Sequence, residues 1–455
     1  MNAIGGSILV SVMLVVIFGS DRWAVIGVMA GMLYLPLGQV IPVFGINLFA
    51  MRFVEIAVFV RIVFRREFLS FVWNGIDRVF FALYTFTTLV FLARSNEGQA
   101  NVIGIAVDAF ICYFSFRMLL EDVEDFKWFL KVFLLFLGPY TALVLTESLM
   151  GYHLFTFLGY VQDVWREGRI RSVGSFDHPA LLGTLGASFV QLYIGLWFSR
   201  KDRMFALAGI VFCLAIVWAS NSGGPISCVI YGLLGWMLWV CRKRMQWFRR
   251  SLVAALCLLA LVMKAPIWFL IAKLGAITGG DSWHRSQIID VFVRHIDEWW
   301  LAGIPIGATK YWLPTYNHVT GGVDLTNNYL CFGAQAGLGA TALSILLLVR
   351  GFSYVGNALE IIRNSSESDS SLEFLFWGFG VVLAVHAFNW LGIPYYDQTY
   401  VLWFMQLAVL ATLSDKVIRS GSNIVELSLP KQELKAMQRH RYRSTITMSK
   451  FQTLA

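Results

Sequence analysis

Long apolar stretches recur along almost the whole chain and are separated by short polar connections. A helical crossing of a bilayer takes about 20 apolar residues, and thirteen stretches approach that length. They are residues 5–19, 22–40, 45–64, 77–93, 101–119, 127–148, 179–199, 203–219, 223–241, 249–270, 327–350, 371–391 and 397–415. The first pair is short and closely spaced, so twelve crossings with one interfacial or re-entrant segment are an alternative. The pattern predicts an all-α, polytopic transmembrane bundle of about 12–13 spans.

The composition agrees with this pattern and excludes two classes of protein. Of the 455 residues, 58% are hydrophobic and only 14% are charged, with a mean hydropathy of +0.66. A soluble protein averages about 25% charged residues, so a soluble enzyme is excluded. Low-complexity disorder is excluded because apolar content this high favours burial. All six cysteines lie in or beside apolar runs, which favours packing residues over disulfides.

The net charge of +8 reflects topology. Basic residues concentrate around residues 65–78, in the connections 200–203 and 242–250, and in the tail 416–455, which carries eight Lys or Arg against two Glu. Short basic loops favour the cytoplasmic side. We therefore expect a membrane domain over residues 1–415, followed by a basic cytoplasmic tail over 416–455. Two long loops, at about 149–178 and 272–326, then fall on the opposite face.

The second of these loops predicts a small periplasmic domain. Its apolar residues Ile288, Ile289, Phe292, Ile296 and Trp299 recur at helical spacing. This spacing indicates an amphipathic helix that lies on the membrane surface or covers a cavity.

The first loop offers candidate chemistry at the membrane boundary. Arg166, Arg169 and Arg171 precede a Gly-Ser turn, and His178-Pro179 opens the next apolar stretch. Proline suits the first position of a helix, whose entrance is electropositive. Arginine presents a planar donor fork that matches phosphate oxygens. These residues predict an anion site, and the alternative is a set of solvated arginines balanced by acidic residues of the same loop.

The second loop shows neither a metal site nor a nucleic-acid surface. His284 and His295 share a helical face, but no third ligand has metal spacing. Its charges are mixed in sign, unlike a nucleic-acid surface. A solvated lid is the alternative to a functional loop. Between two spans, the segment SNSGGPIS (220–227) either lets a ligand approach a helix start or forms a simple hairpin.

Several ionisable residues fall inside the predicted spans, where they are costly in lipid and favour a pathway or bundle-facing role. Asp108, Glu147 and His386 are the clearest of these. They support a transporter of polysaccharide or lipid-linked oligosaccharide as an alternative from another functional class. Transporters usually show internal repeats and paired broken helices, and the sequence shows neither clearly.

Four segments within about residues 165–345 carry a resemblance to a known family. They read RIRSVGSFDHPALLGT, SNSGGP, HRSQIIDVFVRHIDEWWLAGIPIGA and DLTNNYLCFGAQAGLGA. In order and context they resemble the superfamily of O-antigen ligases and Wzy-type O-antigen or exopolysaccharide polymerases. The resemblance implies metal-independent, inverting glycosyl transfer without a cofactor, at the periplasmic face of the bacterial inner membrane. The donor would be a glycan on undecaprenyl diphosphate.

The resemblance also implies roles for individual residues. The family's essential arginines fall on Arg171 in RSVGSF and Arg285 in HRSQ, with Arg169 as a further diphosphate-binding candidate. Fixed guanidinium groups stabilise the charge that grows on a departing diphosphate. Much of the family has a histidine where this chain has Asn327, and asparagine is no general base. We expect Asp324 to activate the acceptor. The alternatives are His318, His178, or an Asn327 that only orients the acceptor.

These expectations combine into a polymerase that joins lipid-linked repeat units into exopolysaccharide or O-antigen. A ligase that transfers the glycan to a separate glycolipid is the alternative within the family. The implied partners are the undecaprenyl-diphosphate-linked oligosaccharide, membrane lipid, a flippase and a chain-length regulator, with no nucleic acid.

Overall fold

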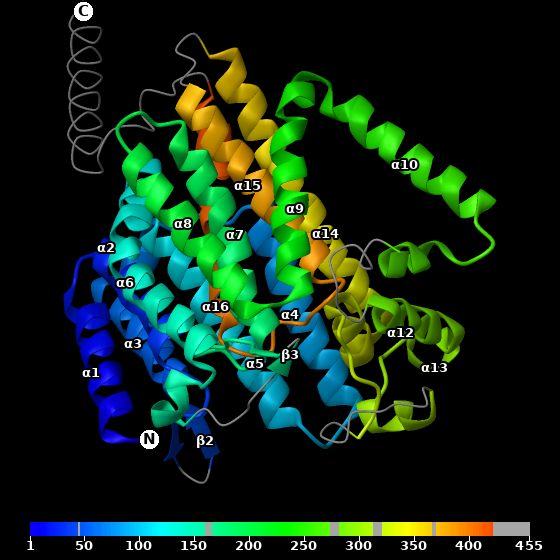
Figure 1. The fold of residues 1–455 in the computed structure, drawn as a ribbon, viewed down its shortest axis with the longest axis horizontal. Coiled ribbons are helices and arrows are strands. Elements are labelled where there is room, and N and C mark those ends of the chain that lie inside the picture. The colour runs from blue at the N-terminus through cyan, green and yellow to red at the C-terminus, as the bar shows by residue number, and fades with distance from the viewer. Residues whose placement is uncertain are drawn as a thin grey trace, which may run out of the picture.

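The computed structural model describes residues 1–43, 46–159, 165–166, 168–273, 282–312, 321–365 and 370–421. Over these ranges the chain is almost entirely helical (Figure 1). Two antiparallel hairpins are the exceptions in the described residues: β1 (Val40–Val43) with β2 (Ile46–Phe49), and β3 (Trp165–Arg166) with β4 (Arg169–Ile170).

Each of the thirteen apolar stretches contains one helix. They are α1 (Ala3–Phe18), α2 (Asp21–Tyr34), α3 (Ala50–Arg65), α4 (Gly75–Arg94), α5 (Gln99–Leu119), α6 (Val123–Met150), α7 (Pro179–Trp197), α8 (Arg203–Ser220), α9 (Gly223–Met237), α10 (Met245–Val262), α14 (Asn328–Asn364), α15 (Ser370–Asn389) and α16 (Thr399–Ser420).

Nine helical stretches in the described part of the chain are long and apolar enough to span a membrane. One of them, Gly223–Val262, joins α9 and α10 through the 3-10 helix η3 (Leu238–Arg244). The helices α1, α2 and α3 have 16, 14 and 16 residues, which is shorter than a full crossing. The chain is therefore an all-α, multi-pass membrane protein, as predicted, and each of its first three helices is shorter than a full crossing.

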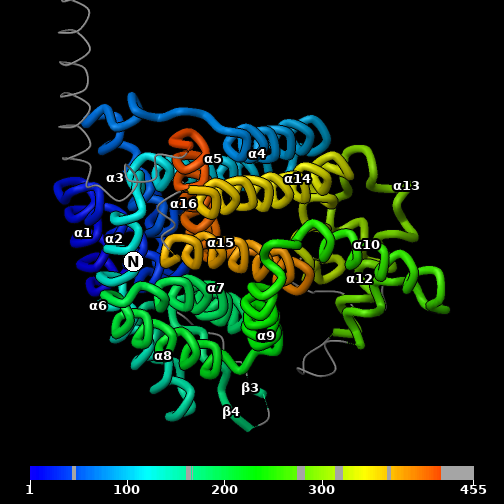
Figure 2. The backbone as a smooth tube through the Cα atoms, turned by 90° about the horizontal axis from the view of Figure 1, so that it is seen from above, coloured from blue at the N-terminus to red at the C-terminus, as the bar shows by residue number. Residues whose placement is uncertain are grey.

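Helices α7 and α16 form the centre of the bundle. Both are buried along most of their length, and α15 packs beside α7 (Figure 2). The outer helices expose large apolar side chains, as lipid-facing surfaces do. In contrast, α10 leans away from the bundle (Figure 1), and none of its residues is buried.

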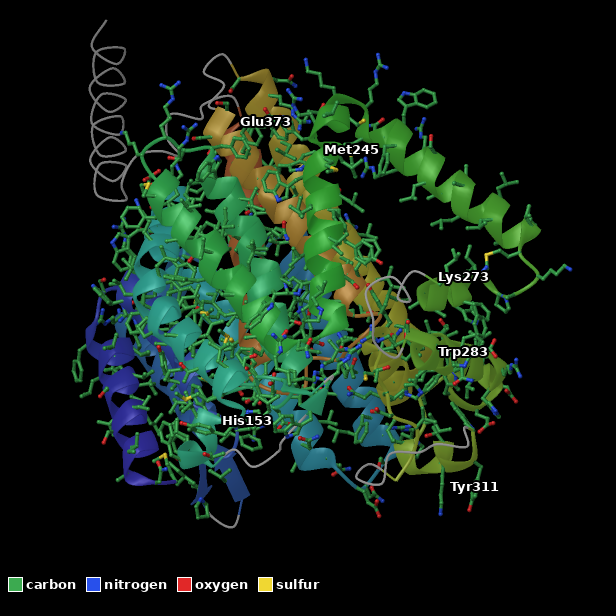
Figure 3. All side chains as sticks on the ribbon, viewed as in Figure 1. His153, Met245, Lys273, Trp283, Tyr311 and Glu373 are labelled. Carbon is green, nitrogen blue, oxygen red and sulfur yellow. The ribbon has the colours of Figure 1, made fainter. Side chains whose placement is uncertain are left out.

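Successive helices run in opposite directions, so the connections alternate between two ends of the bundle. One end carries the basic connections, and Figure 3 shows Met245 and Glu373 there. Its buried charges are paired: Arg117 Nε lies 2.7 Å from Asp77 Oδ1, and the Arg363 guanidinium contacts Glu373. Of the predicted tail, residues 416–420 complete α16, and residues 422–455 lie outside the described ranges.

The other end carries a small helical unit, which precedes α14 in the sequence and packs where that helix is broken. The predicted amphipathic helix forms as α12 (Ser282–Arg294) and α13 (Ile296–Trp299), with a break at His295. The apolar face of this unit packs on the start of α14. Between Ala336 and Gly337 (φ 77°) α14 leaves helical geometry, and the freed Leu338 N–H donates to Trp300 O at 2.8 Å. The periplasmic-loop prediction thus corresponds to a unit that docks into a broken helix.

Candidate functional site

The first loop folds against the connection between α8 and α9. Arg169 Nη2 donates to Trp218 O at 3.1 Å, with its guanidinium carbon 4.1 Å from the centre of the Trp218 ring. The Ser172 N–H donates to Ala219 O at 3.1 Å. These contacts bring the RIRSVGSF and SNSGGP segments side by side. Because Arg169 lies on the Trp218 ring, its guanidinium is engaged in holding the loop.

Arg171 points to the start of α9. Its Nη2 donates to the Ser222 hydroxyl at 3.0 Å, and its Nε is buried without a hydrogen-bond partner. Burial, followed by the positive charges of Arg166 and Arg285, lowers the pKa of Arg171. The guanidinium therefore lies in a positive field, and a bound anion would relieve both the repulsion and the missing hydrogen bond.

Arg285 reaches the same region from α12, far away in the sequence. A β-carbon at Gly392, in the connection between α15 and α16, would lie 3.1 Å from the Arg285 guanidinium carbon. A β-carbon at Gly224, near the start of α9, would lie 3.6 Å from Arg285 Nη2. The guanidinium thus rests against backbone that glycine leaves open. Gly224, the second glycine of SNSGGP, therefore lies beside Arg285.

His178 caps the start of α7 beside the two arginines. His178 is the N-cap residue of this helix, and its Nδ1 accepts the Ala180 N–H at 3.1 Å. Burial and the charges of Arg171 and Arg285 lower the pKa of His178 to about 4. The ring is therefore neutral at pH 7, with its proton on Nε2. In this arrangement His178 offers the site a hydrogen-bond donor, because its accepting nitrogen is already occupied.

The remaining predicted residues lie at the start of α14. Asp324 is exposed, whereas Asn327 is buried and caps α14 by accepting the Leu330 N–H at 3.1 Å. The amide nitrogen of Asn327 is a donor that can orient an acceptor hydroxyl. The Asn328 N–H donates to Trp390 O at 2.7 Å, which attaches this segment to the connection that carries Gly392. His318 lies outside the described residues.

Two buried carboxylates hold the first loop in place. Glu147 accepts the Leu154 N–H at 3.0 Å and the Gly174 N–H at 3.1 Å. Asp397 accepts the Asp177 N–H at 2.9 Å. Glu147 was unusual in the sequence because it lies inside an apolar stretch. The structure shows that its partners are backbone N–H groups of the first loop. Asp397 gave no comparable signal, because it stands at the very start of the predicted span 397–415, where a polar residue is ordinary.

The described residues offer no group of three His, Cys, Asp or Glu side chains that could hold a metal ion. The polar groups that lie near the start of α9 are donors: the Arg171 and Arg285 guanidinium groups, the His178 N–H and the Ser222 hydroxyl. Such a set suits an anionic oxygen ligand.

The neutral state of His178 makes a testable contribution to stability. Its pKa is about 4 in the folded chain against an ordinary value of 6.5, so the unfolded chain takes up the proton first as the pH falls. The stabilisation is therefore complete above about 6.5 and is lost as the pH falls toward 4. In detergent, we expect the free energy of unfolding to drop less between pH 7 and pH 5 in His178→Asn than in the unchanged chain. Asparagine preserves the N-cap, and an identical drop in both would contradict the assignment.

Comparisons of the chain with family models, with curated proteins and with solved structures give no match. The fold and the site describe a multi-pass, all-α membrane protein with Arg171 and Arg285 at one end of its bundle. The two arginines come from separate loops and meet near the start of α9.

Proposed function

We propose that the chain transfers a glycan from undecaprenyl diphosphate to a sugar hydroxyl, at the periplasmic face of the bacterial inner membrane. In its simplest form the reaction extends exopolysaccharide or O-antigen by one repeat unit. The observation that carries the proposal is the meeting of Arg171 and Arg285, which approach one membrane-end site from two loops. Burial, followed by the charges of Arg171 and Arg285, lowers the pKa of His178. Burial, followed by the charges of Arg166 and Arg285, lowers the pKa of Arg171.

The chemistry of the reaction needs such a pair. The acceptor oxygen forms a bond to the anomeric carbon as the bond from that carbon to the phosphate oxygen breaks. The electron pair of the broken bond stays on the diphosphate, and the hydroxyl proton passes to a base. Because negative charge grows on the diphosphate in the transition state, fixed guanidinium groups stabilise that state more than the ground state. The reduced dielectric of a half-buried site strengthens the attraction.

We infer that Asp324, rather than His318 or His178, takes the hydroxyl proton. Its carboxylate is exposed at the start of α14, whereas His178 uses its accepting nitrogen in the N-cap and Asn327 uses its oxygen in the same way. We expect Asp324→Asn to keep its affinity for an undecaprenyl-diphosphate analogue and to lose turnover. Binding assays and product sizing on the same preparation test this. Normal polymerisation by Asp324→Asn would remove Asp324 from the role.

A ligase would use the same donor site with a different acceptor, so the arginine pair supports both readings of the family. A transporter is favoured by the ionisable groups inside the bundle. Those groups have partners within it: Arg52 binds Asp108 through Nε and Nη2, the latter at 2.9 Å, and Glu55 accepts the Tyr400 hydroxyl at 2.6 Å. This pairing is what helix association in lipid requires, and it favours a structural role for these charges.

The location of lipid-linked repeats separates enzyme from transporter. In cells that lack the chain but keep the flippase, we expect single repeats to accumulate on the periplasmic side. Accumulation on the cytoplasmic side would favour transport. A separate experiment tests the expected orientation, in which the basic end and the C-terminus are cytoplasmic according to the positive-inside rule. A membrane-impermeant thiol reagent should label Lys310→Cys from outside and should leave Lys435→Cys unlabelled.

A further inference from the structure

A chain of polar side chains crosses the otherwise apolar contact between α7, α15 and α16. Thr184 and Ser188 lie on α7, His386 and Asn389 on α15, and Gln406 on α16. All five residues are buried. Buried polar side chains are costly unless they are hydrogen-bonded, and each of these five has a partner. The chain leads from the middle of the bundle to the end that carries the arginine pair.

Hydrogen-bonding chemistry fixes the direction of the first half of this chain. Gln406 Nε2 donates to Ser188 Oγ at 3.1 Å, so Gln406 Oε1 faces His386 Nε2, at 2.6 Å. An amide oxygen only accepts, so the imidazole proton is on Nε2. In the neutral ring His386 Nδ1 then accepts, and its partner at 2.7 Å is the Tyr395 hydroxyl, which must donate.

The second half of the chain ends beside Arg285. Asn389 Nδ2 donates to Thr184 Oγ1 at 2.7 Å and to the Tyr395 hydroxyl oxygen at 3.1 Å. Both amide protons are thus used inside the bundle. The side-chain oxygen Oδ1 of Asn389 faces Gly224. A β-carbon at Gly224 would lie 4.0 Å from Asn389 Oδ1 and 3.6 Å from Arg285 Nη2.

Asn389 and Tyr395 also close the turn on which the Arg285 guanidinium rests. Within residues 389–395, the Gly392 and Ile393 N–H groups donate to Asn389 O at 2.8 and 3.0 Å. The bond between the Asn389 and Tyr395 side chains joins the two ends of this turn. Gly392 lies between these ends and contacts Arg285. The conformation of the turn therefore decides where the guanidinium can lie.

We propose that Asn389 and Tyr395 are positioning residues for Arg285: held by His386, they fix the turn 389–395 against the guanidinium. The proposal rests on the function proposed above, in which Arg285 binds the diphosphate of the donor. It explains why a polar chain interrupts the core of the bundle at this place. Arg285 itself comes from α12, so the turn fixes the guanidinium from the membrane side.

The rate at which phenylglyoxal modifies each arginine, followed by mass spectrometry of the full chain in detergent, tests this proposal. We expect Tyr395→Phe and Asn389→Ala to speed modification of Arg285 by at least about 2- to 12-fold, the range that loss of one hydrogen bond gives to a local opening, because each variant loses two such bonds. Tyr395→Phe keeps the ring and removes only the hydroxyl. Modification of Arg294, which is exposed on the same helix, should not change.

Arg294 and Arg117 serve as internal standards for the modification rate of Arg285. Arg117, buried against Asp77, reports general unfolding. An unchanged rate at Arg285, or a rate that rises equally at Arg117, would overturn the positioning role. Inorganic pyrophosphate should protect Arg171 and Arg285 in the unchanged chain. Absence of protection, with Arg285 still faster in the variants, would contradict the diphosphate site and leave the positioning role standing.

Discussion

Replacing Arg285 or Arg171 by alanine is expected to abolish high-molecular-weight polymer, while lipid-linked single repeats accumulate on the periplasmic side. The physical reason is the charge that grows on the departing diphosphate. Removal of one preorganised donor to such a charge lowers turnover by about 10²–10³-fold. The two guanidinium groups act on one leaving group, so either substitution alone should suffice.

Matched variants separate this effect from a general loss of charge. Arg285→Lys keeps the charge but loses the planar donor fork, so we expect partial activity. Arg294→Ala removes an arginine of the same helix that is exposed and pairs with Asp290 at 2.7 Å. It should polymerise normally. Polymer of ordinary length from Arg285→Ala, at equal protein level, would contradict the role of the pair.

Replacing Glu147 by alanine should destabilise the chain and release the loop that carries Arg171. The substitution leaves the N–H groups of Leu154 and Gly174 buried without their acceptor. An unsatisfied buried donor costs about 1–3 kcal/mol, so the two together reach about 2–6 kcal/mol. Gly174 tolerates little rearrangement, because its φ is 56° and a β-carbon there would lie 2.3 Å from the Tyr140 hydroxyl.

Unfolding in denaturant, in detergent, measures the change. Glu147→Gln keeps one acceptor oxygen, so its free energy of unfolding should lie between those of the unchanged chain and of Glu147→Ala. Glu124→Ala, at the start of the same helix, removes a half-exposed carboxylate that pairs with Lys127. It should cost about 0–1 kcal/mol. Equal stability of Glu147→Ala and Glu124→Ala would show that the carboxylate does not hold the loop.

The sequence was sufficient to predict the helices and the two arginine-bearing loops. Apolar stretches of membrane length predict helices reliably, because lipid forces every backbone polar group to be satisfied within its own segment. The resemblance singled out Arg171 and Arg285, and the structure places both near the start of α9. The interruption of α14 at Gly337 was beyond the reach of the pattern, because the group that replaces the helical bond is the distant Trp300 carbonyl.

The finer parts of the site depend on tertiary contacts for the same reason. His178 was a candidate base, and its N-cap bond turns the other nitrogen into a donor. Asn389 and Tyr395 carried no motif, because the role proposed for them arises from partners on α7 and α15 and from the contact of the turn with Arg285. Asp397 likewise acquires its role only through the backbone of Asp177. Hydrogen bonds between separate connections leave no periodic trace in a sequence.

Reaction of the purified chain with a lipid-linked single repeat in proteoliposomes tests the central claim. We expect a ladder of longer lipid-linked glycans and release of undecaprenyl diphosphate, and neither product with Arg171→Ala. Repeats that cross between leaflets with no new glycosidic bond would contradict the proposed glycosyl transfer and favour transport.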